Sequence, residues 1–306
     1  MTALYPALLS SESLSSGPPP GAEPTHPTGV FDDDVRLVWE ARLTVDSGHP
    51  YFFDHPLDHV PAMLLVEGAL QLVGQVSGHG GRPPGVGSLG LDFHRFCELE
   101  EAPVVRAWET PRDPGRWHLE IVQGGTSVGA GSFAYAGRAA SADHPVRGTP
   151  SAAAPVPAGL VHRARSENVL IGGFEQLGED EYAAELLDPP PGHYLVSGTG
   201  PTRSLGELME GLRQFATLLG HEAREVAADG QFIVGSFDVR LDRPLRRGRR
   251  TVLRCCGLPT ARRRGAGVMR FTVHGGPIIG EAAITGHVVS RRAYEHLRRM
   301  RPVGAR

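Results

Sequence analysis

The chain has 306 residues, of which 40% are hydrophobic, so it can bury a sizeable core in one large domain or two smaller ones. Its formal net charge of -3 argues against a protein that coats nucleic acid, which needs a broad basic surface. No apolar stretch reaches the roughly 18 to 20 residues that cross a bilayer, and three cysteines provide neither a disulfide framework nor the spacing of a zinc site.

These exclusions predict a cytoplasmic protein without a metal or a cofactor, which binds neither nucleic acid nor a membrane. Residues 1–30 are rich in Pro, Gly and Ser and contain no Lys or Arg before their short apolar patch. We therefore expect a disordered amino-terminal segment and no secretory signal. A first repeat is expected over residues 31–136, with an early strand in WEARLTVDSGHPYFFDH.

The strongest element of this repeat is a helix within HPLDHVPAMLLVEGALQLVGQV, residues 55–76. Pro61 is a favourable first helical residue, because its missing N–H would have no partner there. From Val60 to Val76 the segment is apolar almost all round, so the helix must be covered on every side. Glu67 is its single carboxylate. Strands with alternating polarity follow, in GVGSLGLDFHRF, RWHLEIVQGG and TSVGAGSFAYAG.

A linker is expected over residues 137–160, because GRAASADHPVRGTPSAAAPVPAGL has no periodicity and is rich in Pro, Ala and Ser. The second repeat, residues 161–292, contains a helix in SLGELMEGLRQFATLLGHEA, with a capping box of Ser204 and Glu207 and a stop at Gly220. Its strands are expected in FIVGSFDVRLDRPL, TVLRCCGL, VMRFTVHGG and GEAAITGHVV. Residues 293–306 are interpreted as a carboxy-terminal tail.

The two halves carry matching features at a nearly constant offset. His49 and His193 are 144 positions apart, and Glu67 and Glu210 are 143 apart. Such an offset indicates an internal duplication. Each half has one buried helix and several antiparallel strands, so we predict an α+β protein, a double hot-dog in which each central helix is wrapped by an antiparallel sheet.

Two arginine-rich segments, RPLRRGRR at 243–250 and ARRR at 261–264, lie in the last quarter of the chain. One interpretation is a solvated hairpin face, the usual place of a run of charges. The other is a docking patch for an acidic partner, such as an acyl carrier protein or a nucleotide-bearing thioester.

The segment DHVPAMLLVEGALQL, residues 58–72, resembles the helix motif of the A-factor biosynthesis hot-dog family, the gamma-butyrolactone synthases of actinomycetes. LMEGLRQFA at 208–216 is similar to the same helix in the other repeat, and LVHRARSENVL at 160–170 looks like the start of that repeat. The resemblance covers about residues 35–290. It implies transfer of a beta-ketoacyl group from a carrier-protein or CoA thioester to the hydroxyl of dihydroxyacetone phosphate, in the biosynthesis of a signalling molecule or secondary metabolite.

The chain departs from the family pattern in two ways. The repeat with the DHVP motif comes first here and second in the family, so the halves look exchanged. The family also has an arginine three residues after each helix glutamate, whereas this chain has Leu70 and, in the second half, Arg213. If these arginines hold a phosphate, the acceptor could instead be another alcohol, an amine or water.

Acyl transfer from a thioester requires removal of a proton from the acceptor and stabilisation of an oxyanion. The start of the buried helix, at Pro61, Ala62 and Met63, is expected to supply unpaired N–H groups and a positive dipole end for the oxyanion. His59 or Glu67 is the expected general base. Glu67 lies about 12 Å beyond His59 along the helix axis, so the two would bracket a substrate.

The second helix is expected to add a polar site with Glu210 as a further catalytic candidate. Arg213 would bind a phosphate or neutralise Glu210, and Gln214 follows on the same helix. Asp58 and His55 complete the predicted substrate-binding residues. The alternatives are structural: a helix cap for Asp58 and His59, a loop residue for His55, and ion pairs for both glutamates.

Three other functions stay open at this point. A hot-dog dehydratase acting on 3-hydroxyacyl thioesters also pairs a loop histidine with a helix carboxylate, and PYFFDHPLDHVPAMLLVEG is distantly similar to that motif. A thioesterase and a non-catalytic protein that binds an acyl chain or a lactone are the others. We expect replacement of Glu67 by Gln to cost more activity than the same change at Glu210, and a homodimer is possible.

Overall fold

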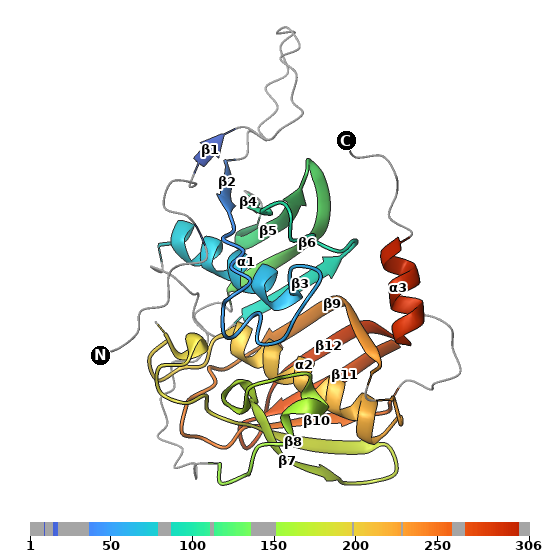
Figure 1. Cartoon of the computed structure of the whole chain (residues 1–306). Coiled ribbons are helices and arrows are strands. Elements are labelled where there is room, and N and C mark those ends of the chain that lie inside the picture. The colour runs from blue at the N-terminus through green and yellow to red at the C-terminus, as the bar shows by residue number, and fades with distance from the viewer. Residues whose placement is uncertain are drawn as a thin grey trace, which may run out of the picture.

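The computed structural model describes residues 9, 15–17, 37–78, 87–110, 113–135, 151–197, 199–227, 229–258 and 267–299. Its elements form two halves, each with one long helix against antiparallel strands (Figure 1). The first half contains β1 (Ser15–Gly17), β2 (Val38–Arg42), α1 (Ala62–Val76), β3 (Gly87–Phe93), β4 (Val104–Thr110), β5 (Asp113–Gln123) and β6 (Thr126–Tyr135).

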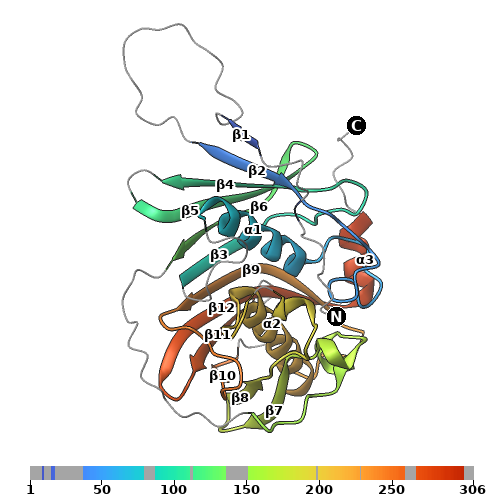
Figure 2. The same ribbon diagram turned by 90° about the vertical axis from the view of Figure 1, so that its left-hand side faces the viewer.

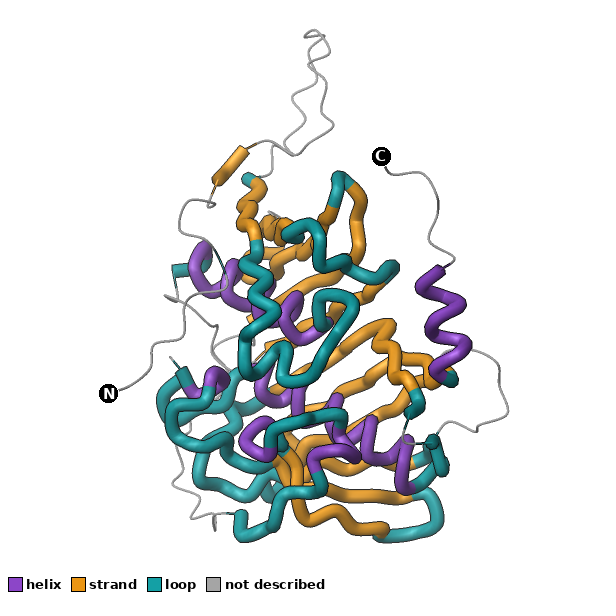
Figure 3. The backbone as a smooth tube through the Cα atoms, in the orientation of Figure 1, coloured by secondary structure: helices purple, strands orange, loops and turns teal. Residues whose placement is uncertain are grey.

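The second half starts with two short 3-10 helices, η1 (Ala158–Val161) and η2 (Ser166–Asn168). The remaining elements are β7 (Ile171–Gln176), β8 (Glu181–Leu186), η3 (Tyr194–Val196), α2 (Leu205–Glu222), β9 (Gln231–Leu241), β10 (Val252–Cys256), β11 (Gly267–His274), β12 (Ile278–Val289) and α3 (Arg291–Arg299). Figure 3 shows that both halves combine strands with a long helix and connecting loops.

The strands form one continuous sheet of 12 strands in the order β1-β2-β4-β5-β6-β3-β9-β12-β11-β10-β8-β7. The halves join where β3 pairs antiparallel with β9, from Gly87 opposite Leu241 to Asp92 opposite Ser236. Alternation places one face of each strand on the core; in β5 the buried residues include Trp117, Leu119 and Ile121. The sheet thereby curls around α1 in one half and α2 in the other (Figure 2).

The two helices are buried in the same way. Almost every residue of α1 from Met63 to Gly74 is buried, and α2 is buried over most of its length. A Cβ on Gly68 would lie 2.3 Å from Cδ2 of Leu43, and a Cβ on Gly211 would lie 2.3 Å from Cδ1 of Leu186. Gly68 therefore lets Leu43 approach α1, and Gly211 lets Leu186 approach α2. The two leucines, like the two glycines, are 143 positions apart. The predicted α+β arrangement, with a wrapped helix in each half, is confirmed.

The segments outside the repeats are only partly visible. The disorder expected for residues 1–30 falls outside the described residues, apart from Leu9 and β1. Of the expected linker, residues 151–160 are described, and Pro155 forms a bridge with Gly172. The expected tail contains most of α3, a helix that the sequence did not predict. Its nine residues include only Ala293, Tyr294 and Leu297 as apolar or aromatic members, a run too short to establish a helical period in the sequence. Within the described ranges, no helix is long and apolar enough to span a bilayer.

Candidate active site

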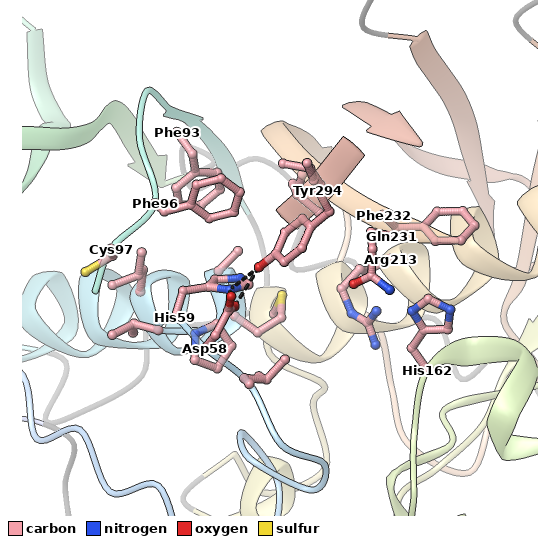
Figure 4. A pocket seen from close by; sticks show the side chains of 18 of the residues that line it. Asp58, His59, Phe93, Phe96, Cys97, His162, Arg213, Gln231, Phe232 and Tyr294 are labelled. Carbon is pink, nitrogen blue, oxygen red and sulfur yellow. Dashed lines mark hydrogen bonds and ion pairs between the residues drawn. The ribbon is translucent and has the colours of Figure 1, made fainter. Parts of the chain in front are cut away.

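A cavity of about 870 Å³ lies between the two halves (Figure 4). Its walls come from the segment that leads into α1, the end of β3, the start of β9, residues 162–164, and side chains of α2 and α3. The sequence-predicted residues that line it are His55, Asp58, His59, Pro61, Ala62, Met63 and Arg213. Glu67, Glu210 and Gln214 are not among the lining residues.

The amino-terminal end of α1 borders this cavity without a side-chain cap. Pro61 is the N-cap residue with an extended backbone, and no acidic residue lies in the first turn. The N–H groups of Leu64 and Leu65 bond the carbonyl of Pro61, whereas those of Ala62 and Met63 have no hydrogen-bond partner in the part of the chain that the structure describes. These two N–H groups, at the positive end of the helix dipole, are suited to a negatively charged oxygen.

His59 is held by Asp58 at the same end of the cavity. Nδ1 of His59 lies 2.8 Å from Oδ1 of Asp58, and the Tyr294 hydroxyl donates to that oxygen at 2.6 Å. Burial alone would raise the pKa of Asp58, but hydrogen bonds from His59 and Tyr294 and the charge of Arg298 outweigh this effect and lower the pKa to about 2. Asp58 is therefore an anion that accepts the Nδ1 proton, which leaves Nε2 of His59 with a lone pair.

Glu210 lies behind the cavity wall in a buried ionic cluster. Its carboxylate accepts from Arg163 Nη2 at 2.7 Å, from Arg213 Nη2 at 2.7 Å and Nε at 2.8 Å, and from Gln214 Nε2 at 2.6 Å. Burial alone would raise the pKa of Glu210, but the charges of Arg163 and Arg213 outweigh this effect and lower the pKa to about 2. Gln214 is fully used, since its Oε1 accepts from Leu170 N at 2.7 Å. Arg213 neutralises Glu210 and also lines the cavity.

Glu67 has a different place from the one expected. Its side chain is fully buried, and a Cβ on Gly206 would lie 1.7 Å from its Oε1, so it packs against the first turn of α2. A carboxylate is favourable at the amino-terminal end of a helix. The expectation placed Glu67 on the substrate cleft. Because α1 is covered on all sides, its periodicity could not show which way the side chain points, and the carboxylate meets the other central helix instead.

The cavity also contains residues that the sequence did not single out. Nε2 of His162 lies 3.1 Å from Nε2 of His221, whose Nδ1 donates to the Val226 carbonyl at 2.9 Å. Nε2 of His221 must then accept from His162, which leaves Nδ1 of His162 as an acceptor. Burial and the nearby Arg213 lower the pKa of His162 to about 4. The sequence pointed to His162 only through the segment LVHRARSENVL, which resembles the start of a repeat in the A-factor biosynthesis family.

Arginines are the main charged residues of the cavity lining, although Arg163 and Arg213 are paired with Glu210 and Arg291 is paired with Glu295. Four arginines line it, whereas its acidic residues are Asp58 and Glu295; the arginines are Arg95, Arg163, Arg213 and Arg291. Apolar side chains such as Phe93, Phe96 and Phe232 supply the rest of the wall (Figure 4). The arrangement suits a ligand with an anionic group and an apolar part.

The pseudo-equivalent place at the start of α2 is filled by ion pairs. Arg203, which is 1% exposed, donates to Glu207 at 2.8 Å, and Arg247 donates to the other carboxylate oxygen at 2.6 Å. Leu70, the departure from the family pattern, is buried in the core and does not line the open cavity. Arg250 of the first arginine-rich segment pairs with Glu185, and the ARRR segment falls outside the described residues.

Comparisons with known proteins agree with this architecture. A model of the A-factor biosynthesis hotdog domain matches residues 28–136 and 146–290. The 2-oxo-3-(phosphooxy)propyl 3-oxoalkanoate synthase of Streptomyces virginiae is 32% identical over 117 residues, which are 36% of this chain and 39% of the relative. The synthase of the same description from Streptomyces coelicolor is 40% identical over 87 residues, 26% of each chain. The match thus spans less than half the length of these curated relatives.

Solved structures share the fold at low identity. The dehydratase domain of PpsC from Mycobacterium tuberculosis, in complex with C12:1-CoA, has a TM-score of 0.55 and 18% identity, over 84% of this chain and 96% of that one. A hot-dog protein of unknown function from Alicyclobacillus acidocaldarius has a TM-score of 0.51 and 13% identity, over 84% and 94%. The predicted double hot-dog fold is confirmed, and the chain belongs to the A-factor biosynthesis hotdog domain family.

Proposed function

We propose that the protein is an acyltransferase that moves a beta-ketoacyl group from a carrier-protein or CoA thioester to the hydroxyl of a small phosphorylated acceptor such as dihydroxyacetone phosphate. The names of the curated relatives, which describe a phosphooxy ester of a 3-oxo acid, support this assignment. One observation carries it furthest. The oriented His59, the unpaired N–H groups of α1 and Arg213 all border one cavity.

His59 acts as the general base in this reaction. Its Nε2 takes the proton of the acceptor hydroxyl, and the resulting oxygen attacks the thioester carbonyl. The N–H groups of Ala62 and Met63 donate to the oxyanion that forms. The tetrahedral intermediate then collapses, the C–S bond breaks, and the departing thiolate takes the proton from His59. Asp58 keeps the ring in the required tautomer throughout.

The free donor group of Arg213 supports an anionic acceptor. Nη1 of Arg213 has no hydrogen-bond partner among the described residues, whereas its Nε and Nη2 are bonded to Glu210. It can donate to a phosphate without releasing Glu210, with Arg95 and Arg291 on the same cavity. Nδ1 of His162, fixed as an acceptor, suits a hydroxyl of the same ligand. The family arginine is thus retained at the open cavity.

The dehydratase alternative has less support from the geometry. It requires a histidine and a helix carboxylate that face one substrate. Neither Glu67 nor Glu210 lines the cavity, and Glu210 is an anion bonded to two arginines. An anion held in this way is a poor proton donor.

The direct test incubates the protein with beta-ketoacyl and 3-hydroxyacyl carrier-protein thioesters, with and without dihydroxyacetone phosphate, and identifies the products by mass spectrometry. We expect an ester that contains the beta-ketoacyl group and the phosphorylated acceptor. Release of free acid alone would indicate a thioesterase, and loss of water from the 3-hydroxyacyl group a dehydratase. An unchanged thioester together with a bound acyl chain or lactone would indicate a binding protein.

A further inference from the structure

Helix α3 lies beyond the residues that the family model matches, which end at 290, and yet it forms part of the cavity. Arg291, Tyr294 and Glu295 of this helix are lining residues. Figure 2 shows α3 beside the loop that leads into α1, far from it in sequence. The cavity is therefore completed by an element beyond the residues that the family model matches.

Polar contacts attach α3 to this place. Because none of its residues is buried, an apolar stripe does not hold the helix against the sheet. Arg298 donates from Nε to Asp58 Oδ2 at 3.0 Å and from Nη1 and Nη2 to Glu98 at 2.8 and 2.7 Å. Its guanidinium also lies 4.7 Å from the ring centroid of Phe96. A paired, partly covered arginine of this kind fixes direction as well as position.

The hydroxyl of Tyr294 meets the pair that we assign to proton transfer. It donates to Asp58 Oδ1 at 2.6 Å and lies 3.2 Å from Nδ1 of His59, as Figure 4 shows. Asp58 Oδ1 is the same oxygen that accepts from His59. The Phe96 ring packs against both, at 5.8 Å from the Tyr294 ring and 5.1 Å from the His59 ring. Tyr294 is thus fixed in direction by packing.

We propose that Tyr294 is a positioning residue for the Asp58–His59 pair, brought to the site by a carboxy-terminal helix that lies beyond the residues matched by the family model. This inference rests on the proposed role of His59 as general base. Burial and the neighbouring Asp58 keep the pKa of Tyr294 above its usual range, so its hydroxyl stays a donor. Its proton shares the charge of Oδ1 and stops the carboxylate from turning away from the imidazole.

Other charged groups also surround His59. Asp58 bonds the ring, Arg298 bonds Asp58 and Glu98, and the other charged or titratable residues of the same cavity lining include His55, Arg95, Arg291 and Glu295. Removing the Tyr294 hydroxyl leaves all of them in place. Asp58 then has one donor fewer, so it attracts the imidazolium more strongly, and the ring holds its proton to higher pH.

The test compares Tyr294→Phe with wild type and with Tyr135→Phe, a control whose hydroxyl bonds Ser77 and which does not line the cavity. We expect kcat of Tyr294→Phe to fall about tenfold with little change in KM, as is common when a catalytic group is less well oriented. The acid limb of the pH–kcat profile should move to higher pH. The control should behave as wild type.

A second pair of variants tests the attachment of α3. Arg298→Gln and Arg299→Gln remove the same charge from the same helix, but Arg299 is exposed and bonds within the helix, to the Glu295 carbonyl at 3.2 Å. Arg298→Gln should lower kcat in the same manner as Tyr294→Phe, and Arg299→Gln should not. Equal kcat values for Tyr294→Phe, Arg298→Gln and wild type would overturn the proposal.

A measurement without substrate separates this proposal from the proposed function. Ring signals of His59 in ¹⁵N NMR titrations should report protonation at higher pH in Tyr294→Phe than in wild type, and no change in Tyr135→Phe. If that shift appears but no acyl transfer is found, the positioning stands and the proposed reaction fails. If transfer is found and neither the titration nor kcat responds, Tyr294 does not position the pair.

Discussion

Equivalent residues of the two repeats have taken different surroundings, which is clearest for the helix glutamates. Glu210 is an anion bonded to two arginines at the wall of the cavity. Glu67, its counterpart, packs against the start of α2 and away from the cavity. The sequence suggested that Glu67→Gln would cost more activity than Glu210→Gln, and the geometry favours the opposite order.

At Glu210, replacement by Gln removes the charge that pairs Arg163 and Arg213. We expect Glu210→Gln to lower kcat/KM by more than tenfold and to destabilise the chain by about 3 kcal/mol, as breaking a buried ionic cluster does. Glu67→Gln, a matched change on the other helix, should retain more activity. Steady-state kinetics and denaturant unfolding measure both effects. A larger activity loss from Glu67→Gln would restore the role that the sequence suggested for it.

Close packing at Gly206 leads to a second prediction. A Cβ there would lie 1.7 Å from Oε1 and 2.8 Å from Cδ of Glu67, and Glu67 is fully buried and cannot swing into solvent. Gly206→Ala should therefore destabilise the chain by about 1–3 kcal/mol, despite the better helix propensity of Ala. Gly159→Ala is the control, since nothing lies within 4 Å of its added Cβ. Equal unfolding midpoints in urea would contradict this packing.

At the scale of elements, the sequence predicted α1, α2 and the antiparallel strands, because their apolar residues repeat with the period of a helix or a strand. It missed α3, whose residues are all at least partly exposed. It also missed the contact of Tyr294 with Asp58, because these residues are 236 positions apart and Tyr294 lies outside the motif that contains Asp58. Pairing between distant polar residues leaves no periodic trace, so only the folded chain reveals it.

The contact between His162, which follows η1, and His221 of α2 makes the stability of the chain depend on pH. Burial, then Arg213, His221 and His55, lower the pKa of His162 from 6.5 to about 4. Between these values the unfolded chain binds a proton that the folded chain does not, so this site's contribution to stability falls as pH falls from about 6.5 to 4. His162→Gln should flatten the dependence in that window. Urea unfolding of the variant and of wild type at several pH values would show this.

For the whole molecule, the two halves share one sheet among the described residues, and the cavity at the start of α1 lies between them. β3 and β9 pair directly, and the core residues of both halves form one cluster. Ion pairs of Arg203, Glu207 and Arg247 fill the place that corresponds to the open cavity. The sequence predicted two wrapped repeats, but the helix motifs could not show the ion pairs at the start of α2, because Arg203 and Arg247 lie outside the motif.

A continuous sheet and a shared core predict that the halves unfold together. All three tryptophans, Trp39, Trp108 and Trp117, lie in the first half, so their fluorescence reports on that half alone. Gly211→Ala strains the second half, because its Cβ would lie 2.3 Å from Leu186. We expect about 1–3 kcal/mol of destabilisation, seen equally by tryptophan fluorescence and far-UV circular dichroism. If the fluorescence midpoint stays at its wild-type value while the dichroism midpoint falls, the repeats unfold independently and the β3–β9 junction does not couple them.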